Sequence, residues 1–471
     1  MELFNTFVRD FANWIWGMPL LFLLLGGGLY FLVYSRFIPF RYFGHAINVL
    51  RGRYDDDDDP GQINHFEALS TALAATVGMG NISGVAVAIA VGGPGAIFWM
   101  WISALVGTAT KYFTCTLAVL YRGKDSSGEL QGGPMYVIRE GLGKKWQPLA
   151  VMFALFGMIG CLPVFQANQL TQAFRDIVFL PNGIEGETVD LGFLVFRDID
   201  MYIGLVILVF VGLVIFGGIK RIGKVASRMV PSMVVLYFIA VVGIILIHYD
   251  AVPHYLGMIF SNAFTADNYN GDAAFGGLLG GLIVLGTRRA AFSNEAGIGT
   301  APMAHGAAKT QEPVREGLVA MLGPFIDTIV VCTLTGLAIL LTGVWQTSDS
   351  NGVTLTATAF QEAFPGFGSY ILMLCILIFA VTSLFSYSYY GTKCLGFLIG
   401  AKRQHWYNYF YVFSILFGAI STLEAIISLI DSAFALMAIP TMVSAVLLSP
   451  KVMQVTRKYV GELKAARAKE L

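Results

Sequence analysis

Glycine and polar residues interrupt an otherwise apolar segment between residues 66 and 92. Gly78, Met79 and Gly80 lie in its middle, and Asn81 follows them directly. A helix that breaks at membrane depth frees carbonyls of its first half and amides of its second half, which need protein or a water-filled cavity to satisfy them. Such carbonyls can bind a hard cation such as sodium, and such amides attract a carboxylate. The segment therefore predicts a site for a zwitterion beside a cation, although the same glycines also suit close packing between helices.

A second glycine-rich segment covers residues 274–304. Its Gly276–Gly277 and Gly280–Gly281 pairs predict another break at membrane depth. Arg288 and Arg289 follow several residues further toward the predicted inner side. They could pair with acidic residues in an inner gate, or extend to the membrane interface.

Polar residues inside the other apolar segments are few and therefore informative. In CLPVFQANQL, Pro163 predicts a kink, and Gln166 and Asn168 could face a cavity or bond to a neighbouring helix. In FAVTSLFSYSYYG, adjacent hydroxyls at Thr382 and Ser383 would suit cation coordination if they face a broken helix.

Asp327 is an acidic residue within the apolar segment 316–343. It could be part of an ion or proton relay, or a structural partner for Lys111, Lys393 or the arginine pair. The sequence shows neither a chain of histidines for proton transfer nor a nucleotide-binding motif.

The composition is that of a protein with many membrane spans. The chain has 471 residues, 56% of them apolar and 13% charged, with a mean hydropathy of +0.69. Its five cysteines show no spacing typical of a disulfide framework or a metal site. The first apolar run is too long for the apolar region of a signal peptide, so we expect it to be a span.

Eleven segments are long and apolar enough to cross a hydrocarbon layer of about 30 Å. The predicted spans are 14–36, 66–92, 95–121, 147–173, 199–219, 225–248, 274–304, 316–343, 368–399, 405–423 and 425–449. The loop before 368–399 contains TLTATAFQEAF, whose Leu355, Ala359 and Phe360 would share one face of a helix lying on the outer surface.

The positive charges alternate strongly between the connections. Of the 30 Lys and Arg residues, 23 fall on one side of the predicted spans, three on the other and four within spans. By the positive-inside rule, the N-terminus lies outside and the C-terminus in the cytoplasm.

This orientation makes the two glycine-broken spans enter from opposite sides. Each begins a set of five spans, which is the pattern of an inverted repeat preceded by one extra helix. The predicted division is 1–60 for the extra helix and an acidic loop, 61–250 and 251–450 for the two repeats, and 451–471 for a basic cytoplasmic tail.

Long stretches of the chain resemble the alanine or glycine:cation symporter family. They are ALSTALAATVGMGNISGVAVAIAVGGPGAIFWMW, GGPMYVI, GGIKRIGKVASRMVP, GTRRAAFSNEAGIGTAPMAHG and GPFIDTIVVCTLTG. The resemblance implies an all-α polytopic membrane protein of 11 transmembrane helices with a LeuT-like inverted repeat. It also implies sodium-coupled, less often proton-coupled, uptake of alanine, glycine or a close relative. A more distant likeness to neurotransmitter:sodium symporters lies in the Gly-x-Gly-Asn break.

These likenesses imply roles for individual residues. The amides of Met79 and Gly80 would hold a substrate carboxylate, and Phe275 with the Gly276–Gly277 backbone would meet its amine. The implied substrate-binding residues are Thr76, Gly78, Met79, Gly80, Asn81, Phe165, Gln166, Asn168, Phe275, Gly276, Gly277 and Ser386. The implied sodium ligands are the carbonyls of Ala74 and Val77 and the hydroxyls of Thr382 and Ser383. Gating or ion relay would fall to Asp327, Arg288 and Arg289.

We therefore expect a secondary active transporter in the inner (plasma) membrane that imports a small neutral amino acid with sodium. Sodium is the only cofactor expected. The other partners are the amino acid and the lipid bilayer, without nucleic acid, and the oligomeric state is left open. A cation channel with a glycine-broken pore and a proton-coupled permease are the alternatives; the absence of a repeated filter segment argues against a channel. No nucleophile–base pair or metal cluster suggests an enzyme.

Overall fold

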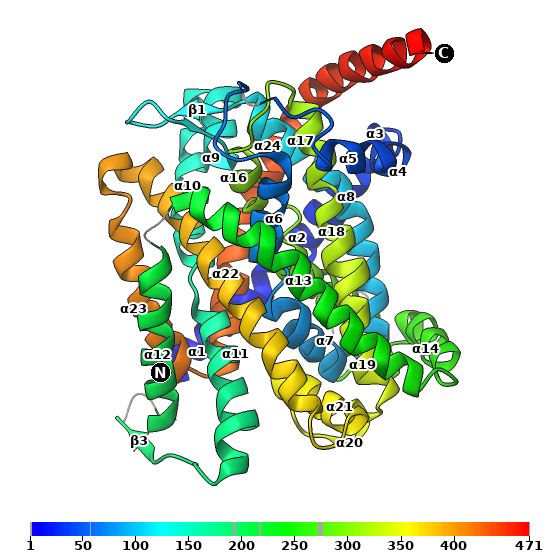
Figure 1. The fold of residues 1–471 in the computed structure, drawn as a ribbon, viewed down its shortest axis with the longest axis vertical. Helices are drawn as coiled ribbons and strands as arrows, with labels where there is room; N and C mark the ends of the chain where they lie inside the picture. The colour runs from blue at the N-terminus through cyan, green and yellow to red at the C-terminus, as the bar shows by residue number, and fades with distance from the viewer. Residues whose placement is uncertain (1, 57, 192–194, 216–217, 272–276, 471) are drawn as a thin grey trace.

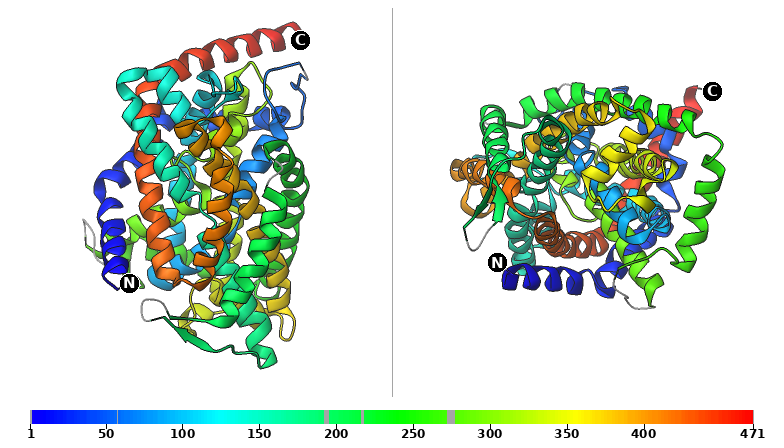
Figure 2. Two further views of the ribbon diagram at one scale, coloured as in Figure 1. Left: turned by 90° about the vertical axis from the view of Figure 1, so that its left-hand side faces the viewer. Right: turned by 90° about the horizontal axis from the view of Figure 1, so that it is seen from below.

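The apolar segments of the sequence form long helices that run mostly along the longest axis of the molecule (Figure 1). The computed structural model describes residues 2–56, 58–191, 195–215, 218–271 and 277–470. The N-terminal helix and the end of the C-terminal helix lie at opposite ends of the molecule (Figures 1 and 2), as the predicted odd number of spans requires.

The N-terminal region contains a bent helix followed by short surface helices. Its elements are α1 (Glu2–Ile15), α2 (Met18–Leu21), α3 (Gly27–Tyr34), α4 (Ile38–Arg41) and α5 (Phe43–Leu50). The segments Arg9–Ile15 and Met18–Tyr34 meet at 49°. Seen from below, α1 lies along the outside of the bundle (Figure 2), as expected for a helix outside a repeat.

The region of the first predicted repeat follows. Its helices are α6 (His65–Thr76), α7 (Val85–Gly92), α8 (Gly95–Leu120), α9 (Pro134–Val137), α10 (Gln147–Gly160), α11 (Val164–Ala173), α12 (Asp198–Ile215) and α13 (Gly218–Ile247). The predicted kink at Pro163 is confirmed, because α10 ends three residues before Pro163 and α11 begins directly after it.

The region of the second predicted repeat completes the chain. Its helices are α14 (Val252–Thr265), α15 (Leu278–Asn294), α16 (Ala301–His305), α17 (Pro313–Ala320), α18 (Leu322–Pro324), α19 (Thr333–Leu341), α20 (Val344–Thr347), α21 (Val353–Ala363), α22 (Gly368–Ile399), α23 (Trp406–Ile420) and α24 (Leu423–Glu470). π-Helical turns occur at Phe22–Gly26, Gly80–Gly84, Ile138–Leu142, Phe174–Phe179 and Phe325–Cys332, and 3-10 turns at Lys144–Trp146, Leu180–Asn182 and Ala401–Arg403.

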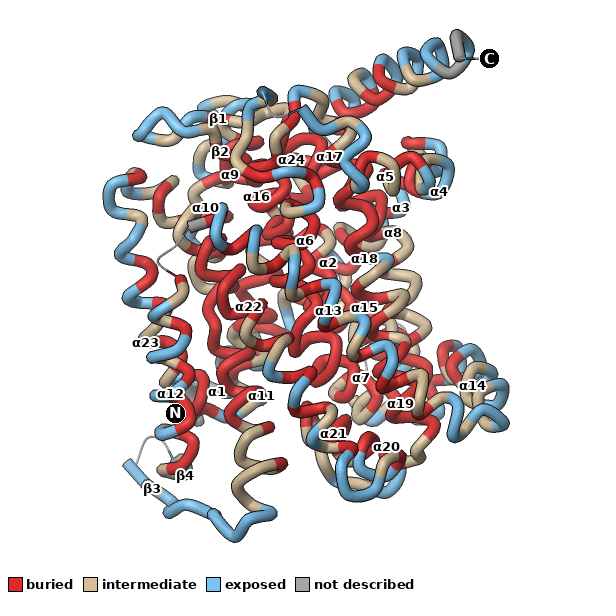
Figure 3. The backbone as a smooth tube through the Cα atoms, viewed as in Figure 1, coloured by how far each residue is buried: buried red, intermediate tan, exposed pale blue. Residues whose placement is uncertain are grey.

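Two small antiparallel hairpins lie at opposite ends of the bundle (Figures 1 and 3). Strand β1 (Gly123–Lys124) pairs with β2 (Leu130–Gln131), and β3 (Thr188–Asp190) pairs with β4 (Val195–Arg197).

The number of membrane crossings is only partly established. Within the described residues, seven helices are long and apolar enough to cross a membrane, or nine if each of two bent pairs forms one span. The predicted spans 274–304 and 405–423 contain α15 and α23, which have only 17 and 15 residues. The chain is therefore a helical, multi-pass membrane protein, while eleven crossings and the repeat boundaries remain predictions.

Buried residues concentrate around α6, α15 and α22 in the middle of the bundle (Figure 3). The expected surface helix differs from the prediction. In α21, Leu355, Ala359 and Phe360 are at most 1% exposed and belong to the core, so the apolar face of α21 packs on protein rather than on the membrane surface.

Candidate functional site

The predicted break in the first glycine-rich span is present. Helix α6 begins with a capping box between Asn64 and Glu67 and ends at Thr76. The chain resumes as a π-helical turn at Gly80, and the two halves meet at 52°. The break is buried, with Asn81 fully enclosed.

The side chain of Asn81 replaces the regular helical hydrogen bonding at this break. In a continuous helix the amide of Gly78 would bond the carbonyl of Ala74, but it donates to Oδ1 of Asn81 at 2.9 Å. The amide of Asn81 in turn bonds the carbonyl of Gly78 at 3.1 Å rather than that of Val77. The carbonyls of Ala74 and Val77 therefore lose their regular helical partners, as the sequence analysis expected for sodium ligands.

Ser383, one of the two predicted hydroxyl ligands, faces this break, and Thr382 is next to it in α22. Helix α22 packs against α6, and a Cβ built on Gly78 would overlap Oγ of Ser383. Thr382 and Ser383 each donate a 3.0 Å bond to the carbonyl of Phe379, which leaves their oxygen lone pairs available. Two released carbonyls and two hydroxyls form an oxygen-only set suited to a hard cation.

The side-chain amide of Asn81 joins the break to two other helices. Its Nδ2 atom donates to Ser293 of α15 at 3.0 Å and to the carboxylate of Asp327 at 2.9 Å. That carboxylate also accepts from Ser293 at 2.6 Å and from Thr328 at 2.8 Å. Asp327 is thus fully buried among neutral donors.

The second break lies elsewhere than the sequence analysis placed it. Gly280 and Gly281 are within the continuous helix α15, and Gly277 is an exposed residue at its start. Phe275 and Gly276 lie outside the described residues. The helix ends at Asn294, and residues Glu295 to Thr300 separate it from α16. The prediction of a break at Gly280–Gly281 was therefore wrong by more than three turns.

Glu295, Gly297 and Gly299 form this second break with φ values of +55°, +87° and +107°. The carboxylate of Glu295 is buried and accepts from the hydroxyls of Tyr387 and Thr300. The amide of Ala296 donates to Oδ1 of Asn294 at 2.9 Å, which releases the carbonyl of Phe292 from its helical partner.

The arginine pair contacts an acid, as predicted. Arg288 bonds Asp431 of α24 at 2.5 Å, and Arg289 contacts the same carboxylate oxygen. Both arginines lie in α15, before the second break, and Arg288 also donates to Asn13 of α1 at 3.0 Å. A role of the pair in a gate stays a prediction.

The polar residues of α11 divide between two roles. Asn168 donates to the carbonyls of Gly418 and Ser421 at 3.0 and 2.7 Å, and it also lines an outer cavity of about 440 Å³. Gln166 is buried, and its Oε1 has no partner among the described residues. Gln169, which the sequence analysis did not single out, accepts from Ser83 beyond the break and from the amide of Val353 at 3.1 Å.

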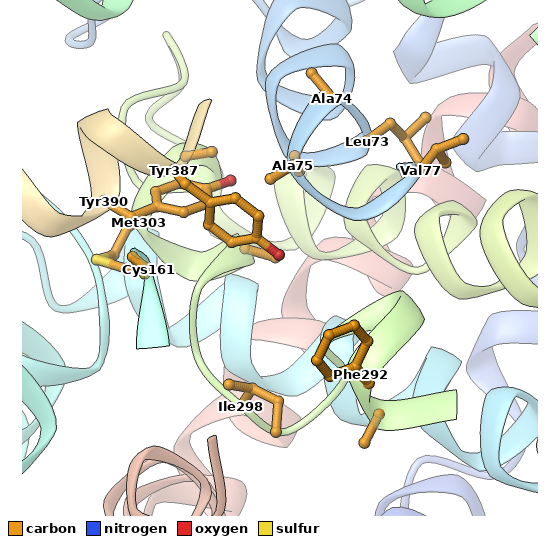
Figure 4. Close-up of a cluster of buried hydrophobic side chains, with 14 of the residues drawn as sticks. Leu73, Ala74, Ala75, Val77, Cys161, Phe292, Ile298, Met303, Tyr387 and Tyr390 are labelled. Atoms are coloured by element: carbon orange, nitrogen blue, oxygen red, sulfur yellow. The ribbon is translucent and has the colours of Figure 1, made fainter. Parts of the chain in front are cut away.

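Side chains from α6, α22 and residues 292–303 surround the centre of the bundle (Figure 4). Phe165 and Phe292 meet edge to face with ring centroids 4.7 Å apart, and Phe292 also lies 3.4 Å from a Cβ position on Gly80. The hydroxyls of Ser386 and Tyr390 are buried without a partner in the described part of the chain. Such polar atoms can bind a small polar ligand.

The predicted inner side contains a cluster that the sequence analysis missed. Glu316 of α17 contacts His65 through one carboxylate oxygen and His305 through the other, the latter at 2.5 Å. The sequence showed no chain of histidines. The fold brings together His65 and His305, which lie 240 residues apart in the chain. Nearby, Arg122 donates to the carbonyls of Gly306 and Thr310 at 2.8 and 3.1 Å.

Comparison with known proteins places this geometry in a family. Residues 1–471 match the sodium:alanine symporter family. The chain belongs to this family. It is 38% identical over 471 residues to the sodium/alanine symporter AgcS of Methanococcus maripaludis, covering 99% of each chain. It is also 36% identical to the probable sodium/glutamine symporter GlnT of Bacillus subtilis, covering 96% of this chain and 90% of that one.

The fold of this family member is similar to that of a solved transporter. The crystal structure of MhsT in complex with L-phenylalanine gives a TM-score of 0.58 at 12% identity, covering 81% of this chain and 89% of MhsT. That likeness supports a LeuT-type fold. Membership of the family makes the chain a secondary amino-acid transporter of the membrane, and the family implies sodium coupling.

Proposed function

We propose that the chain imports a small neutral amino acid, alanine or glycine, together with sodium across the plasma membrane. The observation that carries the proposal is the break at Val77–Met79, where the carbonyls of Ala74 and Val77 lack their helical partners and Oγ of Ser383 lies against Gly78. The family and the name of AgcS support sodium and alanine, whereas the name of GlnT supports a larger neutral substrate.

In this proposal sodium binds to the carbonyls of Ala74 and Val77 and to the two hydroxyls of α22. The substrate carboxylate binds at the amides of Met79 and Gly80, where the positive end of the second half-helix stabilises negative charge. The released carbonyl of Phe292 takes the role of amine acceptor that the sequence analysis gave to residues 275–277.

The aromatic pair Phe165 and Phe292 limits the size of the substrate. Phe292 also packs on Gly80, so the ring sits directly beside the proposed carboxylate site. We infer that these rings leave room only for a small side chain such as that of alanine or glycine. Asp327 supports the site through Asn81 and Ser293.

Alternating access follows from the two breaks. Each lets the inner half of a span move relative to its outer half, and ligand binding shifts the balance between outward and inward forms. One positive charge entering through a potential of about 100 mV supplies about 2.3 kcal/mol, enough for roughly fifty-fold accumulation.

Uptake of labelled alanine into proteoliposomes tests this function. We expect accumulation under an inward sodium gradient, and none with equal sodium on both sides and no voltage. Competition by glycine but not by glutamine would support the small substrate. Uptake driven by a proton gradient in the absence of sodium would contradict the coupling ion, and a sodium current without amino acid would indicate a channel.

A further inference from the structure

The His65, Glu316 and His305 cluster connects the inner halves of both broken spans. His65 is the first residue of α6, and His305 is the last residue of α16. One carboxylate, on α17, accepts from Nδ1 of each histidine. All three side chains are at most 1% exposed. Any movement of either inner half away from α17 must break a contact to Glu316.

The backbone beside the cluster holds the same elements together. The amide of Gln62 donates to the carbonyl of Ala307 at 2.8 Å, and that of Lys309 donates to the carbonyl of Ile63 at 2.7 Å. The segment before α6 is therefore paired directly with the segment after α16. Separation of the two inner halves has to disrupt this pairing together with the histidine contacts.

A proton has a route to this cluster from the predicted cytoplasmic side. Nε2 of His65 has no hydrogen-bond partner in the described chain and lies 4.0 Å from the carboxylate of Asp55, which is 36% exposed. The other groups that act on the cluster electrostatically are Arg315 of α17, Arg122 after α8 and Cys115 within α8. Asp55 is therefore the only carboxylate besides Glu316 in this set.

We propose that these three residues form a proton-binding site on the inner side that keeps the inner path closed. The inference rests on the proposed transport function. With both histidines neutral, the ionised Glu316 leaves the cluster with one negative charge. A proton that enters past Asp55 binds Nε2 of His65, no bond is broken, and the cluster becomes neutral. The bond from His65 to Glu316 then joins opposite charges and is stronger.

The sign of the effect follows from linkage. Protons bind more tightly to the closed form, where His65 contacts the carboxylate, than to an open form that exposes it. Acidification of the interior therefore favours closure and slows exchange of substrate with the interior. Histidine is the side chain suited to this, since it titrates near neutral pH.

Efflux from proteoliposomes tests the proposal. Vesicles are loaded with labelled alanine and saturating sodium, and the internal pH is set to about 6 or about 8 at a constant external pH. We expect efflux about fivefold slower at the acidic internal pH, because an imidazolium–carboxylate bond exceeds a neutral one by about 1 kcal/mol. Glu316→Gln removes the charge and should give equal rates at both values.

A matched control uses the exposed His405 on the same predicted side, between α22 and α23. His405→Gln should retain the full effect of internal pH. If Glu316→Gln does not fold, His65→Asn and His305→Gln carry the same test, and each should reduce the effect. As a readout apart from transport, amide hydrogen exchange of residues 60–68, corrected for the intrinsic rate, should slow at acidic pH in the native chain and in His405→Gln but not in Glu316→Gln.

The possible results separate the two proposals. Sodium-dependent efflux that is equal at both internal pH values overturns the proton site and leaves the transport function intact. Loss of the pH effect in His405→Gln, or its persistence in Glu316→Gln, also overturns the proton site. An absence of alanine efflux at every pH contradicts the proposed function itself.

Discussion

The two broken spans satisfy the polar groups at their breaks in different ways. At the first break, the neutral side chain of Asn81 satisfies the amide of Gly78, and no charged side chain lies between residues 77 and 84. At the second break, Glu295 brings a buried negative charge that Tyr387 and Thr300 satisfy from within the protein. In both, an asparagine oxygen replaces a helical carbonyl as acceptor.

This difference suggests that the first break binds the ligands and that the second has a structural role. A break without charges of its own leaves its carbonyls and amides available to a cation and a carboxylate, so the charges there come from the ligands. At the second break, groups of the protein already satisfy the charge of Glu295, so this break forms a stable turn. It serves as a hinge and forms one wall of the site. We therefore expect mutations at the first break to change sodium binding, and mutations at the second to change stability without changing sodium affinity.

Gly78→Ala should have the largest effect. A Cβ at this position overlaps Ser383, so α6 and α22 must separate where sodium is proposed to bind. We expect alanine uptake to fall by at least about tenfold, with a higher sodium requirement. Gly84→Ala is the matched control, because the nearest atom to its Cβ is 3.9 Å away. Equal losses in the two variants would contradict this assignment.

Asn81→Ala and Asn294→Ala compare the two breaks directly. Asn81→Ala removes a donor to Asp327 and the acceptor for Gly78, at a cost of about 1–3 kcal/mol, and should weaken sodium-dependent alanine binding about tenfold or more. Asn294→Ala removes bonds to Thr328 and Ala296 and should lower the thermal midpoint while leaving sodium affinity unchanged. Sodium titration and thermal unfolding measure both. If sodium affinity falls equally in both variants, the breaks do not differ as described.

Thr382→Ala combined with Ser383→Ala tests the cation ligands of α22. We expect the sodium concentration for half-maximal uptake to rise about fivefold to thirtyfold, with little change at saturating sodium, because each hydroxyl contributes about 0.5–1 kcal/mol. Ser388→Ala is the control, since its buried hydroxyl bonds within α22, to the carbonyl of Phe385. An unchanged sodium dependence in the double variant would remove these residues from the site.

Phe165→Leu should have the smallest effect. It tests whether Phe165 and Phe292 limit the size of the substrate. Loss of the edge-to-face contact with Phe292 is worth about 1 kcal/mol, so uptake of alanine should change by less than about fivefold. Inhibition of uptake by glutamine should increase, because the wall beside Gly80 becomes smaller and more mobile. No change in competition by larger amino acids would show that this pair does not set the size limit.

The first break could be predicted because its determinants are local. Glycines and an asparagine within four residues carry both the flexibility and the replacement acceptor. The kink at Pro163 was predictable for the same reason. The pair Thr382 and Ser383 was predicted from its adjacent hydroxyls and the family resemblance. Ser383 lies against the break, and the sodium-binding role of both residues stays a prediction.

The second break was misplaced because glycine pairs do not always end a helix. Gly280 and Gly281 are buried in α15, where small residues permit close packing. The true break does carry a local signal, since Gly297 and Gly299 precede Pro302 in the first turn of α16. Glu295 in a left-handed conformation was not predictable, because its partners come from α22 and from the break itself.

The long-range contacts could not be read from the sequence. Asp431 lies 142 residues from Arg289, and Glu316 lies 251 residues from His65. Each is a single acidic residue whose partner is fixed only by how the spans pack. The charge alternation predicts the orientation of the chain, but it does not predict which acidic residue the arginines contact.

The most direct test of the central claim is calorimetric titration of the purified protein with alanine, in sodium and in choline buffers of equal ionic strength. If the first break binds the amino acid and the cation together, alanine should bind only in the presence of sodium, and its Kd should fall as the sodium concentration rises. Alanine binding of equal affinity in both buffers would contradict the claim that the two ligands share this break.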